Sequence, residues 1–167
     1  MTKRILLVDD ERSIRESLSK ILQVENYDVV LAENGQEAIG KHGAERIDLL
    51  LLYLNMPIKN GWATLEWLAE VNPLLPVVII TGRSNQRTLV EAAGADALME
   101  KPLDVPLLLQ TVRDLLEEPM ERRAQRARSR ASDFRQVLRD SDQFRAMLLE
   151  RFTTPYPWPG SQPPKVP

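Results

Sequence analysis

Two hydrophobic periods alternate along the first 118 residues of the chain. Short apolar runs rich in Leu, Val and Ile predict buried strands, because strands covered on both faces are hydrophobic almost continuously. The stretches between these runs carry apolar residues at helical spacing, as Ile14, Leu18 and Ile21 do. The predicted strands are 4–8, 29–32, 49–54, 77–80 and 97–99, and the predicted helices are 11–24, 36–44, 62–71, 84–93 and 105–117.

This order of elements predicts the fold class. Five strand–helix pairs with apolar strands indicate an α/β domain, in which helices cover both faces of a doubly wound parallel sheet. Turn residues such as Asn34-Gly35 and Asn60-Gly61 separate the elements. Ligands of such folds bind at the carboxyl ends of the central strands, so functional residues are expected at that edge.

The pattern changes near Pro119. Residues 1–118 hold 12 Lys/Arg and 19 Asp/Glu, whereas residues 119–167 hold 10 and 5, so an acidic body precedes a basic extension. We expect three segments: a domain at 3–118, a basic helical extension at 119–152 and a Pro-rich disordered tail at 153–167. The extension has apolar residues at the spacing of a helix that pairs with a partner: Met120, Ala124, Ala127, Ala131, Phe134 and Leu138.

Composition excludes several classes of function. The chain has no cysteine and a single histidine, so disulfide frameworks, thiolate nucleophiles and His-rich metal centres are out. His42 is expected to be a solvated residue near a helix end. No apolar run approaches the ~20 residues that span a bilayer. The N-terminus does not resemble a signal peptide, so we expect a cytoplasmic protein without a membrane partner.

Chemistry-bearing residues follow three of the predicted strands. Asp9 and Asp10 follow the first, Thr81 ends the fourth, and Lys101 follows the fifth. Adjacent carboxylates suit a hard divalent cation, while a hydroxyl and an ammonium group suit phosphoryl oxygens. Each residue alone has a structural explanation, but their order on three strands of this fold predicts a joint site.

These motifs resemble the receiver domain of bacterial two-component response regulators. The resemblance covers about residues 3–118. It rests on Leu7-Val8-Asp9-Asp10-Glu11, Leu54-Asn55-Met56-Pro57 with Asn60-Gly61, Ile80-Thr81-Gly82 and Lys101-Pro102. It implies a flavodoxin-like (βα)5 fold with strand order 2-1-3-4-5.

The resemblance also implies roles for single residues. Asp10 would bind Mg²⁺ directly, Asp9 would act through water, and Asn55 would give a backbone carbonyl. Thr81 would be the switch hydroxyl and Lys101 the contact to the phosphoryl oxygens. A sensor histidine kinase or a downstream signalling protein would be the partner.

Two positions depart from the family pattern. The phosphoacceptor aspartate is replaced by Tyr53, and the switch aromatic three residues before the lysine is Leu98. A phenol, with an ordinary pKa of about 10, is protonated at neutral pH and is a poor acceptor. The missing carboxylate predicts weak Mg²⁺ binding at Asp9, Asp10 and Asn55. We expect the Tyr53 hydroxyl to donate a hydrogen bond to Asp9 or Asp10 and to hold the domain in one state.

Several functions stay open at this point. The first is a phosphorylation-independent receiver that acts by protein contact and is not an enzyme. The second is a phosphorelay receiver that lost its acceptor in this chain only, and the third is a metal-dependent phosphatase or transferase of another α/β family. The arginines of residues 122–139 could bind nucleic acid, remain solvated, or dock on the acidic body of the same chain. A homodimer is a further alternative.

Overall fold

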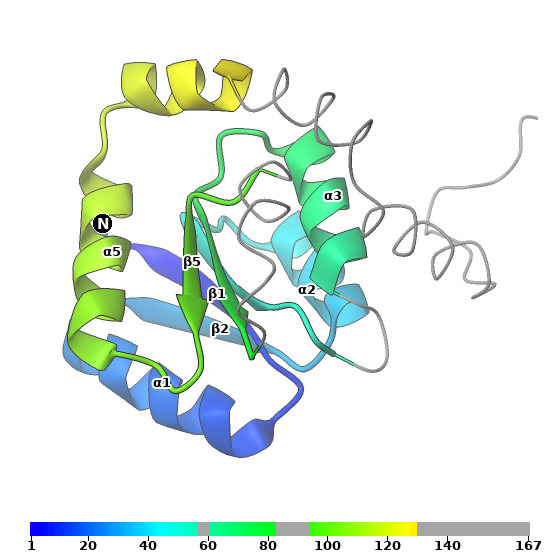
Figure 1. Ribbon diagram of the computed structural model, residues 1–167, viewed down its shortest axis with the longest axis vertical. Helices are drawn as coiled ribbons and strands as arrows, with labels where there is room; N and C mark the ends of the chain where they lie inside the picture. The colour runs from blue at the N-terminus through cyan, green and yellow to red at the C-terminus, as the bar shows by residue number, and fades with distance from the viewer. Residues whose placement is uncertain (57–60, 83–93, 130–167) are drawn as a thin grey trace, which may run out of the picture.

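The computed structural model describes residues 1–56, 61–82 and 94–129, and strands alternate with helices along most of this part of the chain (Figure 1). The strands are β1 (Arg4–Val8), β2 (Asp28–Ala32), β3 (Leu49–Tyr53), β4 (Val77–Thr81) and β5 (Ala97–Glu100). The helices are α1 (Arg12–Val24), α2 (Gly35–Ala44), α3 (Gly61–Val71) and α5 (Val105–Glu117). Each element ends within one residue of its predicted range. The helix predicted at 84–93 lies outside the described residues.

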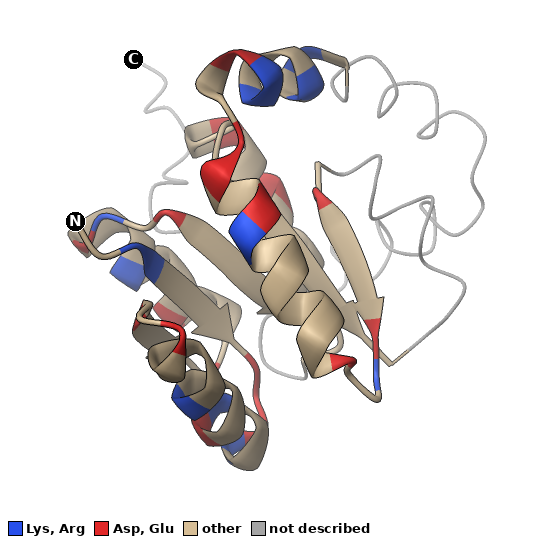
Figure 2. Ribbon diagram, turned by 90° about the vertical axis from the view of Figure 1, so that its left-hand side faces the viewer, with Lys and Arg blue, Asp and Glu red and all other residues tan. Residues whose placement is uncertain are grey.

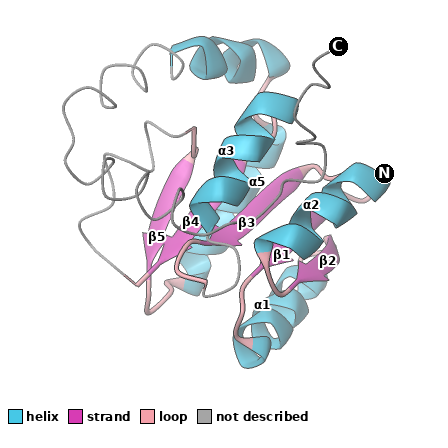
Figure 3. Ribbon diagram, turned by 90° about the vertical axis from the view of Figure 1, so that its right-hand side faces the viewer, coloured by secondary structure: helices cyan, strands magenta, loops and turns pink. Residues whose placement is uncertain are grey.

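The five strands form one parallel sheet in the order β2-β1-β3-β4-β5, which confirms the predicted topology (Figure 3). β1 and β3 lie side by side at the centre, with Leu6 opposite Leu50 and Val8 opposite Leu52. Their side chains are fully buried. The continuous apolar strands of the sequence are therefore strands with both faces covered.

Alternate residues of each strand face two separate hydrophobic clusters. Leu6, Leu50 and Ile79 face the cluster under α2 and α3, to which Leu65 and Leu68 of α3 contribute. The intervening residues face the second cluster, under α1 and α5; these are Ile5, Leu7, Leu49, Leu51, Val78 and Ile80. The apolar stripes of α1 and α5 meet this second cluster through Leu18, Leu22, Leu108, Val112 and Leu115.

Gly61 fixes the return of the chain from β3 into α3. Its N–H donates a hydrogen bond to the carbonyl oxygen of Leu54 at 3.1 Å. A Cβ atom at this position would lie 2.7 Å from both the Leu54 Cα atom and the Tyr53 carbonyl oxygen. Only glycine permits so close an approach, which places the start of α3 directly against the end of β3.

The chain continues as a helix after α5. Residues 120–129 are helical and lie beyond the amino end of β5 (Figure 1). Blue Lys and Arg positions on this helix lie beside the acidic end of α5 in Figure 2. Of the residues on its predicted apolar seam, Ala124 and Ala127 are half-buried and Met120 is 56% exposed; pairing of this seam with a partner stays a prediction. The remainder of the predicted extension and the Pro-rich segment at 153–167 lie outside the described residues.

Within the described ranges, no helix combines the length and the apolar character that crossing a membrane requires.

Candidate functional site

The predicted site residues meet at the carboxyl edge of the sheet. Asp9 follows β1, Tyr53 ends β3 and Thr81 ends β4, and these three strands are consecutive neighbours. Lys101 follows β5, and its N–H donates to the carbonyl oxygen of Thr81 at 2.8 Å. The topology therefore brings four side chains from distant parts of the sequence into one row.

Asp9 is the buried carboxylate of this row. Its side chain has no exposed surface, and its Oδ1 atom accepts a hydrogen bond from the Glu11 N–H at 2.9 Å. Lys101 Nζ lies 3.3 Å from Asp9 Oδ2. Burial raises the pKa of the Asp9 carboxyl above its ordinary value, while the Glu11 N–H and the Lys101 ammonium group pull that pKa down. Asp10, by contrast, is exposed to solvent.

Tyr53 interacts with Lys101 through its ring. Lys101 Nζ lies 3.9 Å from the centroid of the Tyr53 ring, which is a cation–π contact. No hydrogen bond joins the Tyr53 hydroxyl to Asp9 or Asp10, so that expectation was wrong. The aromatic face takes part in place of the hydroxyl, because the ring packs among the side chains at the end of β3 while Lys101 reaches over it. Lys101 thus contacts an anion and an aromatic ring together.

Thr81 and Asn55 form a second polar pair in the site. The Thr81 side chain is fully buried, and its hydroxyl donates to Asn55 Oδ1 at 3.1 Å. Leu98, at the position of the switch aromatic, is half-buried and packs against the cluster under α2 and α3. The structure therefore places all seven predicted residues in one domain and joins Asp9 to Lys101 and Thr81 to Asn55.

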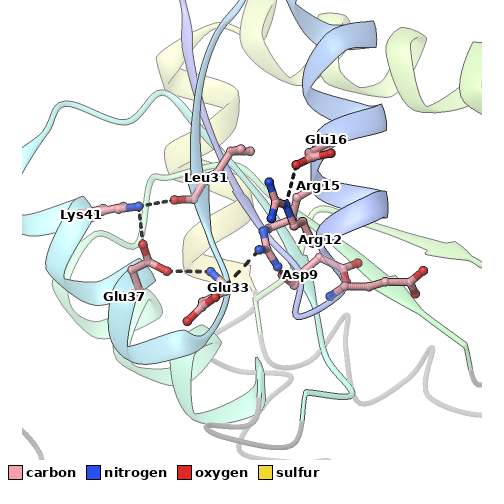
Figure 4. A network of polar contacts seen from close by, with 9 residues as sticks. Asp9, Arg12, Arg15, Glu16, Leu31, Glu33, Glu37 and Lys41 are labelled. Atoms are coloured by element: carbon pink, nitrogen blue, oxygen red, sulfur yellow. Dashed lines mark hydrogen bonds and ion pairs between the residues drawn. The ribbon is translucent and has the colours of Figure 1, made fainter.

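Arg15 is a residue of the site that the sequence did not identify. Arg15 Nη1 donates to the backbone carbonyl of Asp9 at 2.6 Å, and Nη2 lies 3.9 Å from Glu33 Oε2 (Figure 4). The network continues through Glu37, which accepts from the Glu33 N–H and from Lys41. Arg15 thereby ties the turn after β1 to the loop after β2. One arginine in an amphipathic helix gives no sequence signal for this role.

His42 is less exposed than expected. Its ring packs edge-on against Trp67 at a centroid distance of 5.8 Å, and its Nε2 atom lies 3.4 Å from Asn72 Nδ2. Burial lowers the pKa of His42 below its ordinary value. The solvated position predicted for it was wrong, because α3 packs against the end of α2 and covers the ring.

Comparison with known proteins identifies the class of this fold and site. A family model described as the response regulator receiver domain matches residues 5–113, and the chain belongs to that family. Response regulators named MprA are similar in sequence: that of Mycobacterium bovis BCG is 37% identical over 118 residues, which are 70% of this chain and 51% of the relative. The MprA of Mycolicibacterium vanbaalenii is 36% identical over the same shares. The chain thus spans about half the length of these relatives.

Solved structures give the same class. A CheY-like receiver domain protein of Methanospirillum hungatei has a TM-score of 0.69 at 31% identity, covering 73% of this chain and 98% of its own. The response regulator TrrA of Thermotoga maritima, in complex with Mg²⁺ and BeF, has a TM-score of 0.64 at 33% identity over 68% of this chain and 99% of its own. The family is one of signalling domains that bind Mg²⁺ at a phosphorylation site.

The residues of this chain fit a magnesium ion poorly. Mg²⁺ prefers carboxylate oxygens, yet Asp9 already contacts the Lys101 ammonium group, and Tyr53 contributes a ring in place of a carboxylate. Across residues 1–56, 61–82 and 94–129, no three acidic, His or Cys side chains gather closely enough to share a metal ion. The ammonium group of Lys101 provides the positive charge beside Asp9 that a bound cation would otherwise provide.

Proposed function

We propose that this chain is a receiver that signals by protein contact without accepting a phosphoryl group. The single observation that supports this function is Tyr53, a tyrosine at the acceptor position whose ring lies 3.9 Å from Lys101 Nζ. In the receiver family the phosphoryl acceptor is a carboxylate, and Tyr53 brings no carboxylate to this position. The domain is a binding module, not an enzyme.

The charges of the site support a phosphorylation-independent state. Opposite charges about 4 Å apart interact by roughly 4 kcal/mol at an effective dielectric constant of ~20. Lys101 and Asp9 lie within that separation, so the buried carboxylate has its counter-ion inside the chain. Mg²⁺ bound through Asp9, Asp10 and Asn55 is therefore expected to be weak. With no phosphoryl group to bind, Thr81 retains its hydrogen bond to Asn55.

The partners of this receiver belong to a two-component system. We infer a sensor histidine kinase or a downstream signalling protein in the cytoplasm, because the family model covers most of the domain and the relatives are response regulators. We also propose that the receiver domain ends at residue 118 and that a helical extension follows it.

A phosphorylation experiment tests this function. Wild type, Tyr53→Asp and Tyr53→Phe are incubated with acetyl phosphate and Mg²⁺, and each intact mass is measured before and after hydroxylamine. We expect no labile phosphate on the wild type or on Tyr53→Phe, which keeps the ring without the hydroxyl. We expect one labile phosphate on Tyr53→Asp, because the variant restores the missing carboxylate.

The outcomes separate the candidates. A labile phosphate on the wild type contradicts the proposed function and points to Asp9 or Asp10 as the acceptor. The retained Asp9, Asp10, Thr81 and Lys101 favour a second candidate, a phosphorelay receiver that lost its acceptor in this chain only. A folded Tyr53→Asp variant that takes no phosphate contradicts that candidate, because the rest of the site would then be unable to support the chemistry.

A further inference from the structure

The basic helix after α5 is held against the domain by two arginines. Arg126 Nη1 lies 2.6 Å from Asp96 Oδ1, and Arg126 also pairs with Glu118. Arg123 Nη2 donates to the carbonyl oxygen of Leu115 at 2.7 Å. These contacts lie at the amino edge of the sheet, opposite the acidic site, so they are independent of the function proposed above.

Asp96 is a buried anchor. Its side chain is only 2% exposed, and its Oδ2 atom accepts a hydrogen bond from the Val77 N–H at 2.7 Å. A buried carboxylate costs free energy unless it is paired. One oxygen therefore fixes the start of β4, and the other holds Arg126.

Arg123 and Glu118 complete the attachment to α5. Leu115 lies in the last turn of α5, where the carbonyl groups lack partners within the helix. The Arg123 guanidinium group satisfies one of these carbonyls, and Arg123 Nε lies 3.9 Å from Glu118 Oε2. The positive charge of Arg123 also interacts favourably with the negative, C-terminal end of the α5 dipole.

The residues of the attached helix divide into two faces. Arg123, Ala124, Arg126 and Ala127 are half-buried, at the spacing of one helical face. Arg122 and Arg128 are exposed. The Nε atoms of Arg123 and Arg126 are buried without a hydrogen-bond acceptor in the described part of the chain, a cost that opposes the ion pairs. Because the cost of burying these two Nε atoms opposes the gain from the ion pairs, the helix can detach at a small net cost in free energy.

We propose that residues 119–129 form a latch that keeps arginines from the phosphates of nucleic acid. In the closed latch, Arg123 and Arg126 contact Asp96, Glu118 and Leu115. Of the four arginines in this segment, Arg122 and Arg128 are exposed to solvent. Opening the latch exposes two further guanidinium groups. The acidic residues of the domain and the phosphates of a nucleic acid then compete for the same arginines.

The test uses two full-length variants that each remove one negative charge. Asp96→Asn keeps an oxygen for the Val77 N–H but loses the ion pair with Arg126. Glu121→Gln is the matched control, because Glu121 is exposed on the same helix and takes no part in the latch contacts. Amide hydrogen exchange of residues 120–129 and binding of a 20-bp DNA duplex at several salt concentrations are measured for both and for the wild type.

Opening of the latch by Asp96→Asn is expected in both measurements. Exchange of residues 120–129 should accelerate about tenfold, and the plot of log affinity against log salt should steepen by about 0.9 for each arginine that reaches a phosphate. Glu121→Gln should change neither the exchange nor this slope.

Two results overturn the proposal, each at a different step. Unchanged exchange in Asp96→Asn means that residues 119–129 are not held by this pair. Faster exchange combined with no DNA binding, or with the same salt slope as Glu121→Gln, means that the latch does not mask nucleic-acid contacts. Because Asp96→Asn could disturb folding, the exchange measurement is repeated with Arg126→Gln, which removes the other partner of the same ion pair. Arg128→Gln, at an exposed arginine of the same helix, is its control.

Discussion

Lys101 is the residue on which the balance of the acidic site depends. It lies between the buried carboxylate of Asp9 and the ring of Tyr53, at 3.3 Å from the Oδ2 atom and 3.9 Å from the ring centroid. A cation–π contact contributes about 0.5–2 kcal/mol, depending on its desolvation. Pairing also offsets the cost of burying the Asp9 charge. Tyr53 therefore adds a favourable contact to the ammonium group where a third carboxylate would add repulsion between anions.

His42 gives a pH dependence of stability with a definite sign. Burial lowers the pKa of His42 below 6.5, so the folded protein binds fewer protons than the unfolded chain below that pH. The stability that neutral His42 provides is present above about pH 6.5 and is lost as the pH falls through the folded pKa. We expect the free energy of unfolding to fall there by at most about 1.4 kcal/mol per pH unit for this one proton.

Urea unfolding of wild type and His42→Gln from pH 7.5 to pH 5 checks this expectation. Gln has no titrating group, so the difference between the two curves isolates the histidine. The raised pKa of Asp9 acts with the opposite sign, since its contribution to stability declines as the pH rises through its window above 3.8. This contribution is common to both proteins. Parallel curves would show that His42 titrates alike in the folded and unfolded states.

At the scale of an element, the start of α3 depends on one glycine. Gly61→Ala would place a methyl group 2.7 Å from backbone atoms of Tyr53 and Leu54, which cannot move away as a flexible side chain can. Overpacking of this kind costs about 1–3 kcal/mol. We therefore expect a loss of stability in that range, measured by chemical denaturation.

Gly40→Ala in α2 is the matched control for this substitution. A Cβ atom at Gly40 meets nothing within 4 Å, and alanine is favoured over glycine inside a helix by about 1 kcal/mol. The two identical chemical changes should therefore alter the free energy of unfolding in opposite directions. Equal effects would mean that helix propensity, and not the close approach to β3, governs Gly61.

At the scale of the whole molecule, the helix at 120–129 contacts the rest of the structure through Arg123 and Arg126. Removal of residues 119–167 takes away Arg126, which pairs with Asp96 and Glu118, whereas removal of residues 130–167 leaves Arg126 in place. Partly buried ion pairs of this kind contribute about 1 kcal/mol, since solvent reaches the freed carboxylates and limits the loss. We expect the longer truncation to lower the free energy of unfolding by about that amount relative to the shorter one.

Thermal or urea unfolding of the two truncated chains beside the full chain measures this difference. The longer truncation should also lower the thermal midpoint by more than the shorter one does. Identical unfolding of all three chains would limit the domain to residue 118 and reduce the helix to a passive connection.

The sequence by itself determined the elements and their order. The hydrophobic period is local, so the apolar runs at 49–54 and 77–80 and the apolar stripes of the helices at 11–24 and 105–117 could be recognised without any knowledge of contacts. The parallel α/β pattern then placed Asp9, Thr81 and Lys101 at one edge of the sheet, because the carboxyl ends of all five strands point the same way.

Only the tertiary structure decided how side chains pair. Lys101 lies over the Tyr53 ring, Arg15 holds the Asp9 carbonyl, and Arg126 binds Asp96, in each case across turns or strands that sequence spacing does not relate. The same holds for His42, whose burial depends on the approach of α3. Such pairs are selected by packing and by the rotamers that packing allows, so the residues alone predict the site but not the contacts within it.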